Sequence, residues 1–353
     1  MTKMKRNSKK VTVVLLCTLL VALLIYEGGA LLQLTCYAAK HSASLLLFNG
    51  IATKSNTAVF TPVDKEASLP SQPSQPSIET DTTPHLPPPE GVETGEVKTT
   101  ILSLSAANTQ SGGVHVSNKT DRAIDLDDYL DQGLPFTMTE TGQPQVLIVH
   151  THGSEAFAEG DYGYYVKSAS TRSTDNTKNM VAVGQVIADK LNEAGIVTIN
   201  DPTLHDHPNY TGSYTRSAET IQKYLDQYPS IKVVIDAHRD AISGSGDQKI
   251  KPTVEIMGQK AAQIMILAGC ESGSVTDFPN WEENFRFCLQ LQKKIEADYP
   301  GLARPLSFKA CKYNFDMLSG SILIEIGSDA NTLAEAKYSA QLLSQALIKV
   351  LQP

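Results

Sequence analysis

The stretch QVLIVHTHGSEAF, residues 145–157, decides how the rest of the chain is interpreted. Its first half is a short apolar run rich in β-branched residues, which predicts a buried strand. The run ends in two of the chain's eight histidines, His150 and His152, and Glu155 follows three residues later. A buried strand that ends in such side chains is typical of an open α/β sheet, whose site lies beyond the strand ends.

The alternation of strand and helix continues from this stretch to the end of the chain. It predicts helices over 179–195, 213–229, 281–299 and 332–351, and strands over 196–200, 231–238, 253–257, 263–269 and 321–327. Near-continuous apolar strands separated by amphipathic helices are typical of an α/β fold with a largely parallel central sheet flanked by helices. We predict that class for a catalytic domain over 143–353, with room for one antiparallel pair.

The N-terminus has the pattern of an export or anchoring segment. Residues 1–10 are basic and residues 11–26 are apolar, which predicts a cytoplasmic tail and a single transmembrane anchor, followed by a juxtamembrane segment over 27–54. A cleaved signal peptide, with its cleavage site before Ala39, is the alternative. In both cases we expect the downstream chain to lie outside the cytoplasm, at the cell membrane.

Residues 55–96 are rich in Pro, Ser, Thr and acidic residues and poor in large apolar ones, which predicts a disordered linker. Such a chain extends by about 3 Å per residue, so it would act as a spacer between membrane and domain. Residues 97–142 form a lead-in segment with short strand-like pieces and a small helix within 123–138.

Charge and cysteine content exclude two classes of function. The net charge is −8 and no cluster of Lys or Arg follows residue 10, which argues against a nucleic-acid partner. Beyond the N-terminal apolar region, Cys270, Cys288 and Cys311 have no CxxC spacing, so they indicate neither a disulfide framework nor a zinc ribbon. We expect them to be small buried side chains.

Polar side chains that suit hydrolysis interrupt three of the predicted strands. They are His150, His152 and Glu155 after the first strand, Asp236, His238 and Arg239 on a later one, and Glu325 in the last. A zinc hydrolase needs three nitrogen or carboxylate ligands, an open position for water and a carboxylate base. We predict His152, Glu155 and His238 as ligands of Zn2+ and Glu325 as the catalytic base.

Several alternatives remain open at this stage. Only one histidine of the first pair needs to bind the metal; we prefer His152, because Gly153 lets the backbone turn close to an ion, and we give His150 a supporting or substrate role. Asp175 is a reserve oxygen ligand in place of Glu155. The remaining candidates for substrate contact or support are Asp236, Arg239, Arg216 and Tyr214.

A purely structural interpretation of the same residues also exists. His238 would then be a hydrogen-bonded strand end, and Glu325 would pair with Arg239 or Arg216. A carboxylate in an apolar strand needs a partner because burying it unpaired is unfavourable by several kcal/mol.

The segments VLIVHTHGSEAF, HDHPNYTGSYTRS, IKVVIDAHRD and ILIEIGSDANTLAEAKYSAQLL together resemble the stage II sporulation protein P family of endospore-forming bacteria. The resemblance covers roughly residues 100–352. It implies peptidoglycan hydrolysis during engulfment, by cleavage between N-acetylmuramic acid and L-alanine and of peptide cross-links. It also implies a fold like that of zinc-dependent N-acetylmuramoyl-L-alanine amidases, and the sporulation proteins D and M as partners.

Carried over residue by residue, the family's histidine motif falls on His150 and His152, its HRD motif on His238, and its terminal-strand glutamate on Glu325. One departure stands out. Zinc amidases of this class take their ligand glutamate from the start of the first helix, where this chain has STDNTKN and no glutamate.

Two other functions compete with a zinc amidase acting on peptidoglycan. A zinc carboxypeptidase-like peptidase would need an arginine for the terminal carboxylate, and Arg239 is the obvious candidate. A non-catalytic scaffold that binds the wall at the septum is disfavoured by the complete set of ligand-type side chains.

Overall fold

The computed structural model describes residues 87–139 and 142–352, all of which belong to one unit, Pro76–Pro353. The predicted tail, anchor and juxtamembrane segment and residues 55–86 of the predicted linker lie outside the described residues. Within the described part of the chain, no helix is both long and apolar enough to cross a membrane.

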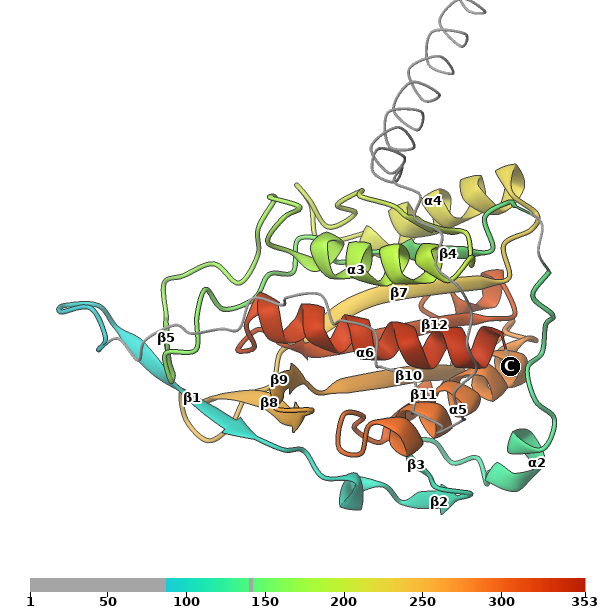
Figure 1. The fold of residues 1–353 in the computed structure, drawn as a ribbon, viewed down its shortest axis with the longest axis horizontal. Coiled ribbons are helices and arrows are strands. Elements are labelled where there is room, and N and C mark those ends of the chain that lie inside the picture. Colours follow the sequence, from blue (N-terminus) through green and yellow to red (C-terminus); the bar gives the residue numbers. More distant parts are fainter. Residues whose placement is uncertain (1–86, 140–141, 353) are drawn as a thin grey trace, which may run out of the picture. The chain divides into compact units, whose positions relative to one another are not determined.

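An eight-stranded sheet forms the centre of the fold, in the order β2-β3-β11-β10-β12-β7-β4-β6 (Figure 1). Its strands are β2 (Thr109–Ser111), β3 (Val114–Asn118), β4 (Val146–Val149), β6 (Thr198–Asn200), β7 (Val233–Asp240), β10 (Ile264–Cys270), β11 (Leu306–Ala310) and β12 (Ser321–Ser328). Strands β6, β4, β7 and β12 are parallel to one another, and β10 is antiparallel to β12 and parallel to β11. The predicted α/β class with a largely parallel sheet is confirmed.

The four predicted helices are present, and they end within a few residues of their predicted limits. They are α3 (Met180–Glu193), α4 (Ser213–Gln227), α5 (Trp281–Asp298) and α6 (Leu333–Leu351). The side chain of Asn179 accepts a hydrogen bond from the amide of Val181 at the start of α3. At the start of α6, Thr332 and Glu335 cap each other's backbone amides, an arrangement that satisfies N–H groups left free at a helix start.

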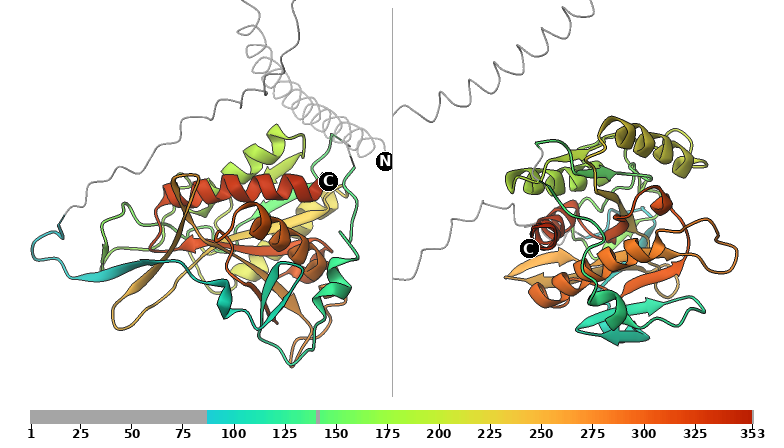
Figure 2. Two further views of the ribbon diagram at one scale, coloured as in Figure 1. Left: turned by 60° about the horizontal axis from the view of Figure 1, so that its bottom comes forward. Right: turned by 90° about the vertical axis from the view of Figure 1, so that its right-hand side faces the viewer.

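The two faces of the sheet are covered differently. Helices α3, α5 and α6 pack on one face, where α3 and α6 lie side by side, whereas α4 lies on the opposite side (Figures 1 and 2). Alternate residues of β4 follow this division: Val146 and Ile148 join the main core, and Leu147 and Val149 join a smaller cluster with Ile221 of α4. Successive side chains of a strand point to opposite faces of the sheet, so a strand made only of apolar residues predicts that both faces are covered.

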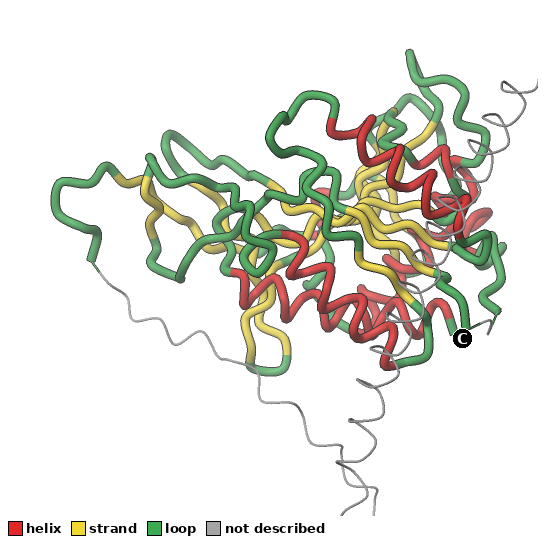
Figure 3. Tube along the Cα trace, turned by 90° about the horizontal axis from the view of Figure 1, so that it is seen from above, coloured by secondary structure: helices red, strands yellow, loops and turns green. Residues whose placement is uncertain are grey.

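A second, four-stranded sheet has the order β5-β1-β8-β9 (Figure 1). It extends from one end of the central sheet, as the view from above also shows (Figure 3). It contains β1 (Thr94–Thr100), β5 (Tyr164–Val166), β8 (Lys249–Ile256) and β9 (Gln259–Ala262). Thr94–Thr100 thus begins inside the residues predicted as linker. The lead-in segment supplies β2, β3 and the short helix α2 (Leu126–Leu130), so it is part of the same fold.

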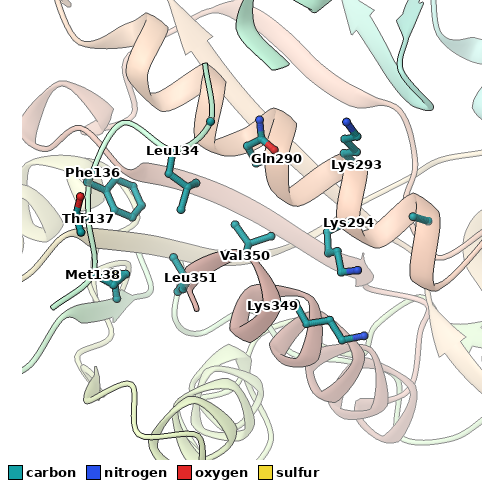
Figure 4. Close-up of a pocket in the computed structure, with 12 residues that line it drawn as sticks. Leu134, Phe136, Thr137, Met138, Gln290, Lys293, Lys294, Lys349, Val350 and Leu351 are labelled. Carbon is teal, nitrogen blue, oxygen red and sulfur yellow. The ribbon is translucent and has the colours of Figure 1, made fainter. Parts of the chain in front are cut away.

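One cavity of about 630 Å³ lies between the segment 133–138, α5 and the end of α6 (Figure 4). Its lining includes Leu134, Phe136 and Val350 with lysines at the rim, and it contains no histidine, cysteine or carboxylate side chain. Without a histidine, cysteine or carboxylate to hold a metal ion, this cavity does not suit metal-dependent hydrolysis.

Candidate active site

A second cavity, with a volume of about 310 Å³, is lined by acidic, basic and histidine side chains. It lies on the sheet face that α4 leaves partly uncovered. Its lining comprises His152, Glu155, Arg172, Tyr210, Tyr214, His238, Arg239, Asp240, Ala241, Leu267, Lys309, Tyr313, Leu323 and Glu325. Six of the residues predicted from sequence therefore meet in one place: His152, Glu155, Tyr214, His238, Arg239 and Glu325. They come from the segment after β4, from β7, from β12 and, for Tyr214, from the first turn of α4.

Strand register places the predicted base beside a predicted ligand. In the parallel pair of β7 and β12, Glu325 lies opposite His238, and Leu323 lies opposite Asp236. Directly paired residues share a face, so Asp236, His238 and Glu325 all point to the same side of the sheet. The pairing shifts immediately after Glu325, and such irregularities are frequent next to active sites.

His238 lies between two carboxylates. Its Nδ1 is 3.6 Å from Glu155 Oε2, and its Nε2 is 3.0 Å from Asp236 Oδ1. Burial opposes the charged ring, but these two carboxylates outweigh it and hold the pKa of His238 well above its usual value. Burial likewise raises the pKa of Glu155, but His238 and Arg239 more than offset it, so Glu155 is ionised at neutral pH.

A buried hydrogen-bond chain fixes Asp236 under His238. The amide and the hydroxyl of Thr151 donate to the two carboxylate oxygens of Asp236, at 2.9 and 2.6 Å. Ser217 Oγ lies 2.7 Å from the Thr151 hydroxyl and accepts a hydrogen bond from the side-chain amide of Asn314. Asp236 is thus held from behind, as is common for groups that orient an active-site histidine.

His152 is a buried residue of the cavity wall and lies among aromatic rings. Its ring stacks on Tyr210, with centroids 4.5 Å apart, and it meets Tyr214 and His238 edge to face at 5.6 and 5.3 Å. Its Nε2 is 3.1 Å from the Tyr210 hydroxyl, and its Nδ1 is 3.4 Å from Ser213 Oγ. Burial and the nearby His238 lower the pKa of His152, so its ring is neutral, the form that binds metals.

Glu325 has a different environment from the other carboxylates of the cavity. Its Oε2 is buried and has no hydrogen-bond partner among the described residues. Burial, reinforced by Glu155 and Asp240, raises the pKa of Glu325 to about 7, although His238 and Arg304 act in the opposite direction. A carboxylate that titrates near neutral pH can both accept and return a proton, which is what a general base and acid needs.

The alternative in which Glu325 pairs with an arginine is not observed. Arg239 donates to the backbone carbonyls of Ala156 and Thr171, and its own amide donates to Glu155. Arg216 donates to backbone carbonyls in the loop 205–211, and it does not line the cavity.

His150 and Asp175 also lie outside the cavity. The His150 ring points toward α3, with Nε2 2.8 Å from Asn200 Oδ1 and Nδ1 3.2 Å from the carbonyl of Ala237. Asp175 is exposed, and its carboxylate accepts hydrogen bonds from Thr177. His152 therefore faces His238 where His150 does not, and Glu155 faces it where Asp175 does not.

The three predicted zinc ligands fit a zinc ion to different degrees. Two ligands that are about 2.0–2.1 Å from a tetrahedral ion lie about 3.4 Å from each other, and His238 Nδ1 and Glu155 Oε2 are 3.6 Å apart without a hydrogen bond. The third donor, His152, directs its nitrogens at hydroxyl groups, and no three His, Cys, Asp or Glu side chains in the described ranges are already arranged around a metal position. Two of the three donors therefore fit zinc in type and spacing, and the third fits in type.

The lining residues that were not predicted from the sequence include Arg172, Lys309 and Tyr313. Arg172 follows no predicted strand; its guanidinium binds Asp206 and lies 3.7 Å from Glu155. Lys309 belongs to β11, which was not predicted although LSFKA has the alternation of a short strand. Recognising that strand would have placed Lys309 on the face of Glu325.

The model of the stage II sporulation protein P family matches residues 63–348. The stage II sporulation protein P of Bacillus subtilis strain 168 is 26% identical over 265 residues, which is 72% of this chain and 58% of that relative. The chain thus covers a little more than half of the length of this curated relative.

Solved structures with similarity include the N-acetylmuramoyl-L-alanine amidase AmiC2 of Nostoc punctiforme, at 13% identity and a TM-score of 0.35, covering 59% of this chain and 94% of that one. The CwlD amidase from Clostridioides difficile in complex with the GerS lipoprotein has 13% identity and a TM-score of 0.36, covering 59% and 96%. The family assignment does not depend on these structures. Because the family model spans most of the sequence, this chain belongs to the stage II sporulation protein P family.

Proposed function

We propose that the protein is a zinc-dependent peptidoglycan hydrolase that cleaves the amide between N-acetylmuramic acid and the L-alanine of the stem peptide during engulfment of the forespore. Membership of the sporulation family supports the biological setting. The observation that carries the chemistry is Glu325, a buried carboxylate with a pKa of about 7, beside His238 in a cavity that also holds His152 and Glu155.

His152, Glu155 and His238 would hold the metal in this proposal. When bound, zinc would act as a Lewis acid on the amide carbonyl and increase the acidity of the attacking water. Glu155 contributes a negative charge that stays ionised at neutral pH, and Asp236 keeps the His238 ring in place from behind. The hydroxyl partners of His152 are neutral groups, which a stronger ligand interaction can replace.

Glu325 performs the proton transfers. Its carboxylate accepts a proton from the water as the oxygen attacks the carbonyl carbon, and it then donates the same proton to the leaving nitrogen as the C–N bond breaks. The immediate products are a lactyl carboxylic acid on the sugar and a peptide with a free amine. The second proton of the water then passes from the acid to the amine, which leaves a carboxylate and an ammonium group, so atoms and charge balance. The Tyr210 and Tyr214 rings shape the approach to the cavity.

A carboxypeptidase-like peptidase is disfavoured by the position of Arg239. Its guanidinium is buried and already donates to the carbonyls of Ala156 and Thr171, so it is not free to bind a terminal carboxylate. A non-catalytic scaffold gives no reason for the raised pKa of Glu325 or for the carboxylates around His238.

The anchor and the partners extend this proposal to the whole protein. Residues 11–26 would hold the chain in the membrane as a single-pass protein, with the hydrolase domain on the extracytoplasmic side and sporulation proteins D and M as partners. Carbonate-resistant sedimentation with membranes that is lost on deletion of 11–26 would support the anchor; unchanged sedimentation after the deletion would contradict it.

The function is tested by elemental analysis and by mass spectrometry of digested peptidoglycan. We expect about one zinc per chain and release of stem peptides that begin with a free L-alanine amine. The variants His152→Ala and His238→Ala are expected to lose zinc and activity together, while the matched variant His205→Ala, outside the cavity, keeps the metal. An active chain without metal, or products cut elsewhere, would contradict the proposal.

A further inference from the structure

Three Lys and Arg side chains line the cavity, and of these only Lys309 has neither a carboxylate nor a backbone carbonyl as partner among the described residues. Arg172 binds Asp206, and Arg239 donates to backbone carbonyls. The ammonium group of Lys309 lies 3.3 Å from the Tyr313 hydroxyl and 4.9 Å from the centre of the Tyr313 ring. Its charge is therefore available to a ligand in the cavity.

We infer that Lys309, with Tyr313, binds a carboxylate of the substrate peptide beyond its first residue. The inference rests on the proposed function and adds a specificity-determining group to it. A protein with a net charge of −8 repels an anionic polymer at long range, so a carboxylated substrate needs a local cation. Wall peptides carry free carboxylates beyond the first residue unless these are amidated.

Strand register gives the position of Lys309 relative to the reaction. Leu267 of β10 lies opposite both Leu323 of β12 and Ser307 of β11, and Lys309 is two residues beyond Ser307. Lys309 is therefore on the face that carries Glu325, but two strands away. Glu325 pairs with Met265 of β10, whereas Lys309 pairs with Gly269, four residues farther along that strand. Neighbouring strands are about 4.8 Å apart and each residue advances about 3.3 Å, so the two backbones are separated by about 10 Å across the sheet and about 13 Å along it.

This separation decides which carboxylate can be bound. A carboxylate on the residue whose nitrogen leaves would lie next to Glu325, too close to contact Lys309. A carboxylate farther along the peptide matches the position of Lys309. The same distance argues against Lys309 as the terminal-carboxylate group of a carboxypeptidase.

Tyr313 is held rigidly beside Lys309. Tyr313 and Asn314 both have positive φ values, 45° and 64°, which are unusual for residues other than glycine and persist only where the surroundings enforce them. The Asn314 side chain donates to the carbonyl of Tyr214 and to Ser217 Oγ, both at 3.0 Å. The Tyr313 ring stacks on Tyr214 with centroids 5.0 Å apart, so Lys309 and Tyr313 form a preformed wall of the cavity.

The test compares two substrates on the full-length wild-type chain: purified peptidoglycan with free carboxylates, and the same material amidated with a carbodiimide and ammonia. A charge-assisted hydrogen bond at a half-exposed site is worth about tenfold in kcat/KM. We expect amidation to lower wild-type kcat/KM by about tenfold, mainly through KM.

Variants of Lys309, tested on the same two substrates, show whether the effect of amidation depends on this side chain. Lys309→Met should cleave the free-carboxylate substrate about tenfold less efficiently and should lose nothing further on amidation, while Lys309→Arg should retain the preference. The matched control is Lys312→Met, because Lys312 pairs with Asp316 and does not line the cavity. It should behave as wild type.

The outcomes separate this inference from the proposed function. Efficient hydrolysis that amidation does not change in wild type, or an amidation effect that persists in Lys309→Met, overturns the role of Lys309 alone. No peptide release from either substrate, or no dependence on zinc, overturns the proposed function and this inference together.

Discussion

The two faces of the central sheet use the same strands for different purposes. On the face covered by α3, α5 and α6, His150 is fully buried, and both of its ring nitrogens have partners. On the other face His152, only two residues later, stands at a cavity with His238 and Glu325. The turn after β4 redirects the chain between them, so two histidines of one motif have unrelated roles.

This difference shows that a buried polar group with all its hydrogen bonds made supports the fold, whereas one left unpaired is available to a substrate. On the covered face both ring nitrogens of His150 are paired, which matters because an unpaired buried group destabilises the fold by about 1–3 kcal/mol. The cavity face keeps Glu325 Oε2 unpaired and Lys309 without an acid partner. Groups left in this state are candidates for contact with substrate.

The largest expected effect is on turnover, from Glu325→Gln. The amide keeps the size of the side chain but cannot accept a proton, so the rate should fall by about 10²–10⁴-fold. Because no arginine pairs with Glu325, the melting temperature should not fall. Dye release from labelled peptidoglycan and thermal melts check this, with the exposed Glu255→Gln as control. A collapsed melting temperature would restore the structural interpretation of Glu325.

The second prediction concerns the pH dependence of stability in the metal-free protein. The pKa of Glu325 is about 7 in the folded state, against its usual value of 4.5, so between these pH values the folded state binds a proton that the unfolded state does not. Stability from this group is therefore present below about pH 4.5 and is lost as pH rises to about 7, by about 3 kcal/mol in total.

Other titrating groups of the site also contribute to the wild-type pH profile. Urea unfolding of the wild type and of Glu325→Gln across this range isolates the component from Glu325, which the variant should lack. Parallel profiles for the two proteins would mean that the carboxylate is not buried in solution.

A smaller loss of stability is expected on the covered face, from His150→Ala. Removing the ring takes away two hydrogen bonds and leaves the side-chain oxygen of Asn200 without its partner, so the free energy of unfolding should fall by about 2–3 kcal/mol. Zinc content at low temperature should stay at the wild-type level, unlike that of His152→Ala. Loss of the metal from a folded His150→Ala protein would mean that His150 is the metal ligand and that the choice of His152 is wrong.

The smallest effect is expected from Gly184→Ala in α3. A Cβ at this position would lie 2.5 Å from His150 Cε1 and 2.6 Å from Asn200 Oδ1. Alanine favours a helix interior, but this overpacking should outweigh it and destabilise the fold by about 1–2 kcal/mol. In a His150→Ala background the penalty should shrink, and additive effects in chemical denaturation would show that the two positions do not contact each other.

Much of the fold followed from the sequence because its signals are local. The apolar strands and amphipathic helices after residue 142 were found at nearly their observed positions. Strands β9 and β11 were missed because they are short and their stability comes from pairing with β8 and β10. For the same reason β1 was assigned to the linker in part: its residues are stabilised by partners more than sixty residues away.

The sequence by itself determined which kinds of side chain interrupt the strands, and therefore the set from which a hydrolase site is built. Only the tertiary structure decided that His152 and not His150 faces His238, that Glu155 and not Asp175 accompanies it, and that Arg239 is engaged by backbone carbonyls. Residue type is local information, whereas orientation depends on strand register and on packing from both faces. These are properties of the assembled sheet, and no single segment of the chain contains them.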